Sequence, residues 1–127
     1  MADRPNILFL MTDQMQGRVL DPAHPCRTPN FDRLAARGVR FRNAHTVNAV
    51  CSPARASLMT GLLPHNHGVL TVTHTKDRDQ CVLRTDKPHW AQRLSAAGYR
   101  TAYFGKWHVE HTNRPQDFGW QLTTYGP

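Results

Sequence analysis

An unbroken apolar run near the amino terminus, ILFLM at residues 7–11, is the feature that most constrains the fold. Five consecutive apolar residues after a proline are typical of a strand buried on both faces, as in a parallel sheet. The run ends in the polar residues Thr12, Asp13 and Gln14. Because ligands of open α/β sheets gather beyond the carboxyl ends of the strands, these side chains are candidates for a site.

A first helix-then-strand unit follows. The segment TPNFDRLAARG, residues 28–38, predicts a short helix in which Thr28 caps the start, Pro29 occupies the first turn and Gly38 marks the end. Its apolar stripe consists of Phe31, Leu34 and Ala35. The alternating residues 39–46 are typical of a strand.

A second unit of the same kind lies in PHWAQRLSAAG, residues 88–98. It places Trp90, Leu94 and Ala97 on one helical face and Gly98 at the end. Residues 99–108 then predict a strand, whereas the polar residues 73–88 predict a surface loop. Two helix-then-strand units indicate an α/β class with a mostly parallel sheet.

The composition bounds the possible classes of protein. The 127 residues suffice for one domain, and 39% hydrophobic with 20% charged residues argues against disorder. No apolar run approaches the roughly 20 residues of a membrane-spanning helix, and no export signal is recognisable. We therefore expect no membrane association and a cytoplasmic location.

The charge favours anionic partners. Sixteen basic and nine acidic residues give a formal charge of +7, with eight histidines in addition. Nucleic acid, phosphate esters and sulfate esters would all suit this balance. The basic residues are spread from position 4 to position 114 without a dense run, so we expect no nucleic-acid partner.

Three cysteines, Cys26, Cys51 and Cys81, are too few and too widely spaced for a disulfide framework or a CxxC pair. Any special cysteine must act alone, and small buried thiols are the default for Cys26 and Cys81. Around Cys51 the pattern differs, because Ser52 and Pro53 indicate a helix start just after it. A helix amino terminus favours an anion, and Arg55 one turn later could add a forked donor. The alternative is a buried thiol beside a solvated arginine.

The segment CSPARASLMTG, residues 51–61, resembles the signature of the sulfatase family. All fixed positions of that signature are present, namely Cys51, Pro53, Arg55, Ser57, Leu58, Thr60 and Gly61. The resemblance implies that a dedicated formylglycine-generating enzyme converts Cys51 to Cα-formylglycine during maturation.

Two further segments resemble the same family in the expected order. RPNILFLMTDQ, residues 4–14, looks like its first strand, which implies that Asp13 and Gln14 are metal ligands. GKWH, residues 105–108, looks like its Lys-x-His element, which implies catalytic roles for Lys106 and His108. The implied fold is the amino-terminal part of an alkaline-phosphatase-like α/β/α sandwich. Residues 1–127 would then be an incomplete catalytic domain that lacks the family's later metal ligands.

The resemblance implies a hydrolase of sulfuric esters. The formylglycine from Cys51 would hydrate, bind a divalent cation together with Asp13 and Gln14, and attack the sulfur of a small anionic ester. Asp13 is a hard oxygen donor that suits Ca²⁺, Mg²⁺ or Mn²⁺, and the resemblance implies Ca²⁺ first among them. Arg55 would hold the formylglycine, Lys106 would contact the transferred group, and His108 would position a hydroxyl or assist its proton transfer.

Other interpretations stay open at this stage. Glutamine at position 14 also occurs among family members that resemble phosphonate monoester hydrolases, so a phosphonate or phosphate ester is an alternative substrate. A non-catalytic basic module that binds anions is another. His65, His67 and a cysteine could hold zinc by ligand type, although their spacing fits no familiar zinc pattern. We expect the 127 residues to be inactive alone and to expose apolar surface.

Overall fold

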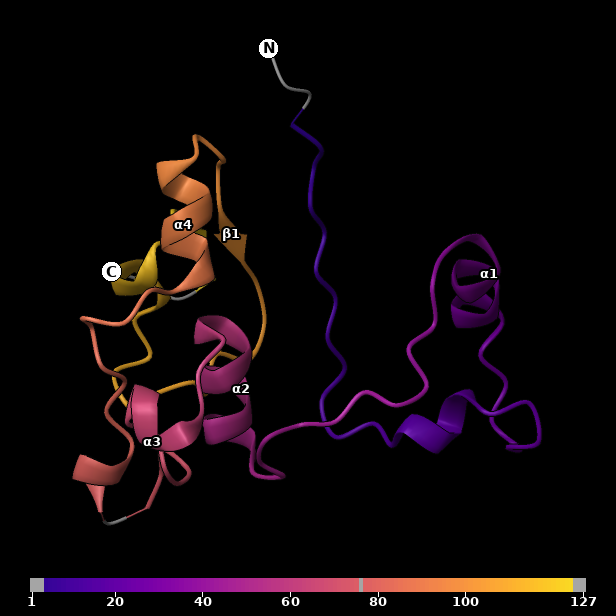
Figure 1. The fold of residues 1–127 in the computed structure, drawn as a ribbon, viewed down its shortest axis with the longest axis horizontal. Helices are drawn as coiled ribbons and strands as arrows, with labels where there is room; N and C mark the ends of the chain where they lie inside the picture. Colours follow the sequence, from indigo (N-terminus) through magenta and orange to yellow (C-terminus); the bar gives the residue numbers. More distant parts are fainter. Residues whose placement is uncertain (1–3, 76, 125–127) are drawn as a thin grey trace. The chain divides into compact units, whose positions relative to one another are not determined.

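The chain consists of two compact units, Met1–Ala44 and His45–Pro127, within which the computed structural model describes residues 4–75 and 77–124 (Figure 1). The first unit holds the 3₁₀ helix η1 (Gly17–Leu20) and the helix α1 (Pro29–Arg37). The second unit holds the helices α2 (Cys51–Thr60), α3 (Pro64–His67) and α4 (Trp90–Ala96), the 3₁₀ helices η2 (Arg78–Gln80) and η3 (Pro115–Phe118), and the strands β1 (Ala102–Tyr103) and β2 (Leu122–Thr123).

The two strands of the second unit pair in parallel, with Ala102 opposite Leu122 and Tyr103 opposite Thr123. Helix α4 precedes β1, so one helix-then-strand unit is present as predicted, and the α/β class is confirmed. Helix α2 packs against α3 and α4. Over the described ranges, every helix is too short or too polar to cross a bilayer.

The apolar core lies in the second unit. Its buried members are Ala56, Met59, Val69, Cys81, Leu83, Ala91, Trp107, Val109, Phe118 and Trp120, with Trp90 and Tyr103 packed against them. The large rings meet mostly edge to face, as aromatic pairs prefer; Trp90 and Trp120, for example, cross at 84° with centroids 4.9 Å apart. The core includes Ala56 and Met59 of α2 and Trp107, which lies between Lys106 and His108.

Helix α4 shows how local sequence sets an element. The ring of His89 accepts a hydrogen bond from the Ala91 N–H, and the Gln92 side chain accepts one from the His89 N–H, which together form a capping box. The predicted face is only partly correct, because Trp90 and Leu94 are half-buried whereas Ala97 is exposed and Ala91 is fully buried. Gly119 approaches this helix so closely that a β-carbon there would lie 2.6 Å from the Gln92 nitrogen, so only glycine fits.

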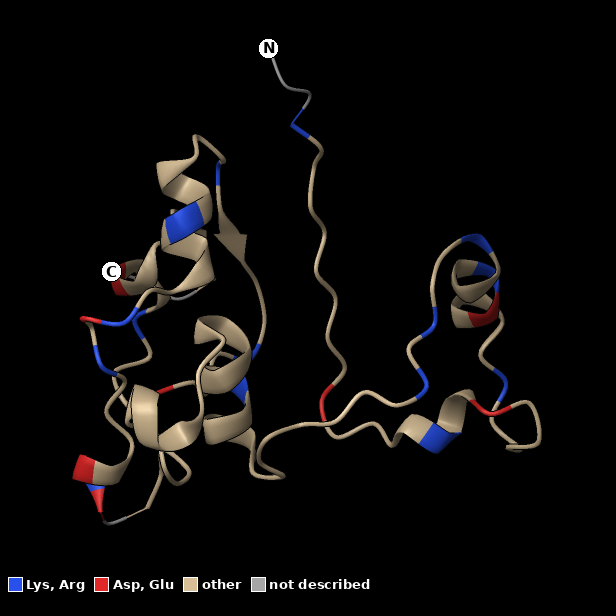
Figure 2. Ribbon diagram, viewed as in Figure 1, with Lys and Arg blue, Asp and Glu red and all other residues tan. Residues whose placement is uncertain are grey.

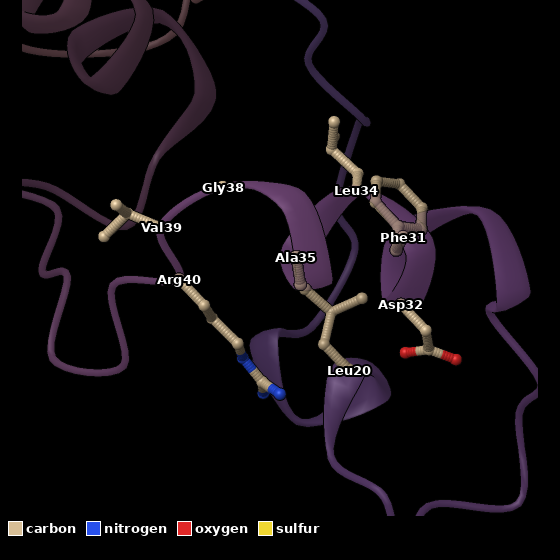
Figure 3. Close-up of a pocket in the computed structure, with 8 residues that line it drawn as sticks. All are labelled: Leu20, Phe31, Asp32, Leu34, Ala35, Gly38, Val39 and Arg40. Atoms are coloured by element: carbon tan, nitrogen blue, oxygen red, sulfur yellow. The ribbon is translucent and has the colours of Figure 1, made fainter.

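Helix α1 has the predicted bounds, but its apolar stripe is not covered. Phe31 and Leu34 are 42% and 66% exposed. With Leu20, Ala35 and Val39 they line a hollow of about 360 Å³, to which Asp32 and Arg40 add charged side chains (Figure 3). Thr28 stands at the N-cap position, although its side chain makes no capping hydrogen bond.

The prediction of a strand at residues 7–11 is wrong in this chain. The segment runs extended but forms no strand, and its side chains are exposed, with Leu8 and Leu10 at 82% and 79% (Figure 1). A strand buried on both faces needs neighbouring strands and covering helices, and the described residues of this unit supply no such sheet. Residues 39–46 likewise form no strand, for the same reason.

The strand predicted at residues 99–108 exists but is shorter, limited to β1. Left-handed backbone at Gly105 and His108, with φ of 94° and 48°, follows it. The polar segment 73–88 is mostly irregular as predicted, apart from η2 and a bridge between Val69 and Cys81. Strand β2 was not predicted, because two residues carry no periodicity.

Candidate active site

Helix α2 begins at Cys51 itself, one residue earlier than the sequence suggested. Val50 is the N-cap with an extended backbone, and the Ala54 N–H donates to its carbonyl at 3.0 Å. Cys51 therefore occupies the first helical position, half-buried, with a thiol that is not in a disulfide. Gly61 ends the helix in the left-handed conformation, with φ of 71°, which glycine adopts without a steric penalty.

Arg55 is buried, with 7% of its surface exposed, so the alternative of a solvated arginine does not hold. Its Nη1 donates a 2.8 Å hydrogen bond to the main-chain carbonyl of Lys106. The hydroxyl of Tyr103 donates to the same carbonyl. The first turns of α2 and the Lys-x-His segment, 51 residues apart in sequence, are thus joined through Lys106.

The Lys-x-His segment is anchored at its central residue. Trp107 is fully buried, whereas Lys106 is exposed and His108 is half-buried. His108 has a left-handed backbone, an uncommon conformation that costs a residue other than glycine about 1 kcal/mol or more and recurs at functional sites. Core packing of Trp107 thus holds two polar neighbours at the surface of the unit.

Glu110, which sequence reasoning missed, completes that anchor. It is 2% exposed, and its carboxylate accepts hydrogen bonds from Trp107 Nε1 at 3.0 Å and from the N–H and Oγ1 of Thr112, both at 2.7 Å. His111 Nδ1 lies 3.7 Å from it. A buried carboxylate needs such donors to offset its lost hydration. No periodicity in the sequence marks this residue.

A third segment joins the site through the loop after α3. The backbone N–H of Thr73 donates to Ser52 Oγ at 3.3 Å, directly beside Cys51. The next residue, His74, stacks its ring on that of His108, with centroids 5.6 Å apart and an interplanar angle of 1°. His74 was predicted only as part of a polar surface loop.

His67 has a structural role that excludes the zinc alternative for this side chain. Its Nδ1 accepts the Val69 N–H at 3.1 Å, so Nε2 carries the proton and donates to Ser57 Oγ at 2.9 Å. Both ring nitrogens are therefore occupied, and the ring is fully buried. Burial lowers the pKa of His67 below its ordinary value, chiefly by desolvation. The pair links α2 to α3.

The remaining predicted residues, Asp13 and Gln14, belong to the first unit. Both are exposed at the end of the extended run, and Gln14 has a left-handed backbone with φ of 53°. A carboxylate and an amide oxygen are donors that fit a hard divalent cation. Over residues 4–75 and 77–124, no three His, Cys, Asp or Glu side chains cluster as a metal site. The grouping of Asp13 and Gln14 with Cys51 stays a prediction.

The other two cysteines differ from each other. Cys81 is fully buried in the core, as predicted. Cys26 is exposed, so the prediction of a buried thiol is wrong there. Cys26 lies in the first unit, which among the described residues has no buried apolar side chain to pack against it.

Comparison with known proteins identifies the class. The Sulfatase family model matches residues 5–125. The chain is 38% identical over 117 residues to N-acetylglucosamine-6-O-sulfatase of Bacteroides thetaiotaomicron, covering 91% of this chain and 19% of that protein. It is 37% identical over 124 residues to choline-sulfatase of Rhizobium meliloti, covering 95% and 23%. A crystal structure described as a sulfatase from Bacteroides thetaiotaomicron matches with a TM-score of 0.68 at 28% identity, over 83% of this chain and 22% of that one.

The chain belongs to the sulfatase family, and its α/β architecture is part of the alkaline-phosphatase-like fold of its structural neighbours. It spans about a fifth of the length of these relatives.

Proposed function

We propose that this chain is the amino-terminal portion of a hydrolase of sulfuric esters whose nucleophile derives from Cys51. The observation that carries the proposal is the hydrogen bond from Arg55 to the Lys106 carbonyl, because it joins the signature helix to the Lys-x-His segment. Membership of the sulfatase family supports it. So do the sulfatase names of relatives at 37–38% identity.

The surroundings of Cys51 fit its conversion to formylglycine by a modifying enzyme. The thiol is half-buried and not in a disulfide, at the first position of a helix whose signature residues are complete. When formed, a formylglycine would supply a hydrated aldehyde, with one hydroxyl for attack and a second for release of the product. Arg55, buried one turn along α2, has the charge and the position to hold that group.

Lys106 supplies a positive charge for a sulfate ester, and His108 supplies a group that can carry a proton. Lys106 is exposed, and hydrogen bonds from Arg55 and Tyr103 hold its main-chain carbonyl in place. Its ammonium group can bind the oxygens of the transferred group. The half-buried imidazole of His108 can hold or transfer a proton at the leaving or attacking oxygen. The buried Trp107 between them keeps both in place.

A divalent cation is the cofactor that the family implies, with Ca²⁺ first and Mg²⁺ or Mn²⁺ as alternatives. Asp13, Gln14 and the group derived from Cys51 would be its ligands in this chain. Such a cation would supply positive charge that lowers the pKa of a bound hydroxyl. Because a Ca²⁺ site takes six to eight oxygen ligands, as a rough rule, this set is incomplete. The isolated chain should therefore hydrolyse no sulfate ester.

The test of this function is the binding of an aryl sulfate, 4-nitrophenyl sulfate, to the 127-residue chain. Binding is measured from chemical-shift changes in a ¹⁵N-labelled sample, where weak affinity suffices. We expect changes at Lys106, His108 and the first turn of α2, competition by inorganic sulfate, and loss of binding in Lys106→Ala. Lys87→Ala is the matched control, since Lys87 pairs with Asp86 outside the site.

Three outcomes would point elsewhere. Tighter binding of an aryl phosphonate than of the aryl sulfate would favour a phosphonate or phosphate ester hydrolase. Binding of heparin that is salt-sensitive and unaffected by Lys106→Ala would favour a basic anion-binding module, whose charges are spread along both units (Figure 2). Equal loss of aryl sulfate binding in Lys106→Ala and Lys87→Ala would remove Lys106 from the site.

A further inference from the structure

The ring of His74 lies parallel to that of His108, at an interplanar angle of 1° and a centroid separation of 5.6 Å. His108 is a residue of the candidate site, and His74 comes from a loop 34 positions earlier that matches none of the sequence motifs discussed above. A parallel pair at this distance lies within the range in which aromatic rings attract each other. The stack therefore connects a segment without an assigned role to the imidazole that the proposed chemistry needs.

The loop that carries His74 is itself fixed to the signature helix. The N–H of Thr73 donates to Ser52 Oγ, and Ser52 is fully buried next to Cys51. On the other side, the Arg55 guanidinium reaches the Lys106 carbonyl. Two hydrogen bonds and one ring stack thus connect three segments to one another, namely the first turns of α2, the loop at residues 73–74 and the Lys-x-His segment.

His108 needs such support because of its backbone. Its φ of 48° places it in the left-handed region, which residues other than glycine rarely adopt. Such a conformation persists only when surrounding contacts enforce it. The burial of Trp107 fixes the residue before it. The ring of His74 restrains the imidazole plane itself, since rotation of the His108 ring would break the parallel stack.

We propose that His74 is a positioning residue of this site, which holds the imidazole of His108 in one orientation by stacking. The inference rests on the proposed function only for what His108 then does to an ester. The stack can be tested without any turnover.

The test is NMR spectroscopy of the 127-residue chain with ¹³C-labelled histidine rings. We expect a cross-relaxation signal between the ring protons of His74 and His108. In His74→Ala the ring-proton resonances of His108 should move toward those of an unstructured histidine. In His74→Phe, which keeps a flat ring but neither nitrogen, they should stay displaced. His65→Ala is the matched control, because His65 is exposed on α3.

The outcomes separate this inference from the proposed function. If the His108 resonances are the same in wild type and His74→Ala, or already match an unstructured histidine in wild type, the positioning role is wrong. If His74→Phe behaves as His74→Ala does, the nitrogens rather than the stacked ring matter, and the role is again wrong. The proposed function fails by different measurements, namely tighter binding of an aryl phosphonate than of the aryl sulfate, or salt-sensitive binding of heparin that Lys106→Ala leaves unaffected.

Discussion

Arg55 Nη1 donates a 2.8 Å hydrogen bond to the carbonyl oxygen of Lys106, and the arginine that makes it is almost fully buried. A buried cation is costly unless its donors are matched, so this contact has a structural as well as a chemical role. It fixes the backbone of the residue whose ammonium group is proposed to meet the ester. The two roles can be separated by experiment.

Replacing Arg55 should destabilise the second unit. Arg55→Ala removes a charge-assisted hydrogen bond and packing, and we expect the free energy of unfolding to fall by about 2 kcal/mol or more. Urea unfolding followed by tryptophan fluorescence measures it, since all three tryptophans lie in this unit. Arg93→Ala, at an exposed position on α4, should change the unfolding free energy little. Equal effects of the two replacements would contradict the account.

Replacing Glu110 should loosen the Lys-x-His segment. Glu110→Gln keeps the shape of the side chain but replaces one carboxylate oxygen by an amide NH₂, which donates. The three groups that bond to this side chain, Trp107 Nε1 and the N–H and Oγ1 of Thr112, also donate, so at least one of them loses its acceptor. Leaving buried donors unmatched costs about 1–3 kcal/mol, so thermal unfolding by near-UV circular dichroism should shift to a lower temperature. Asp86→Asn, at an exposed carboxylate, is the control and should leave the transition in place.

The site could be predicted from the sequence where a fixed pattern carries it. Cys51, Arg55, Lys106 and His108 were identified by motif. In the structure, two hydrogen bonds and a ring stack join the start of α2, the loop at residues 73–74 and the Lys-x-His segment. Glu110 and His74 could not be found, because a buried carboxylate in an irregular turn and a ring stack between distant loops leave no periodicity. Residue type alone does not reveal them.

The fold was predictable in the same uneven way. Helices α1 and α4 follow from local signals, namely an early proline or cap and a terminal glycine. The strand at residues 7–11 was predicted from an apolar run and the strand at 39–46 from alternation, and such patterns lead to a strand only where a sheet is present to pair with it. The partners of a strand come from distant parts of a sequence and cannot be read from local residues. Residues 7–11 are therefore extended here but belong to no sheet within the residues that the structure describes.

Acid should destabilise the second unit through His89. Burial among Trp90, Trp107, Phe118 and Trp120 lowers the pKa of His89 to about 4, from 6.5 in the unfolded chain. Because the unfolded chain binds the proton more readily, this contribution to stability is complete above pH 6.5 and is lost as the pH falls toward 4. The loss amounts to about 3 kcal/mol at most.

Urea unfolding at pH 7 and pH 4.5 measures this effect. His89→Asn keeps an acceptor at the helix N-cap but removes the titrating ring, so the difference between the two pH values should shrink. His65→Asn, on an exposed histidine, should leave the difference unchanged. A wild-type stability that does not fall between pH 7 and 4.5 would contradict the role of His89.

The first unit should make the chain self-associate. Its exposed apolar side chains include Leu8, Leu10, Leu34, Val39 and Phe41, at 66–82% exposure. Surfaces of this kind favour association. Light scattering should show oligomers that grow with concentration, and the double replacement Leu34→Lys and Phe41→Lys should reduce them. A chain that stays monomeric at high concentration without these changes would contradict this reading of the surface.

The fate of the Cys51 side chain is the most direct test of the whole account. The chain is produced together with a formylglycine-generating enzyme, and the peptide spanning residue 51 is analysed by mass spectrometry. The account predicts a loss of about 18 Da, the difference between a CH₂SH and a CHO side chain, confined to this peptide and absent from the peptides of Cys26 and Cys81. An unmodified Cys51 thiol under these conditions would contradict it.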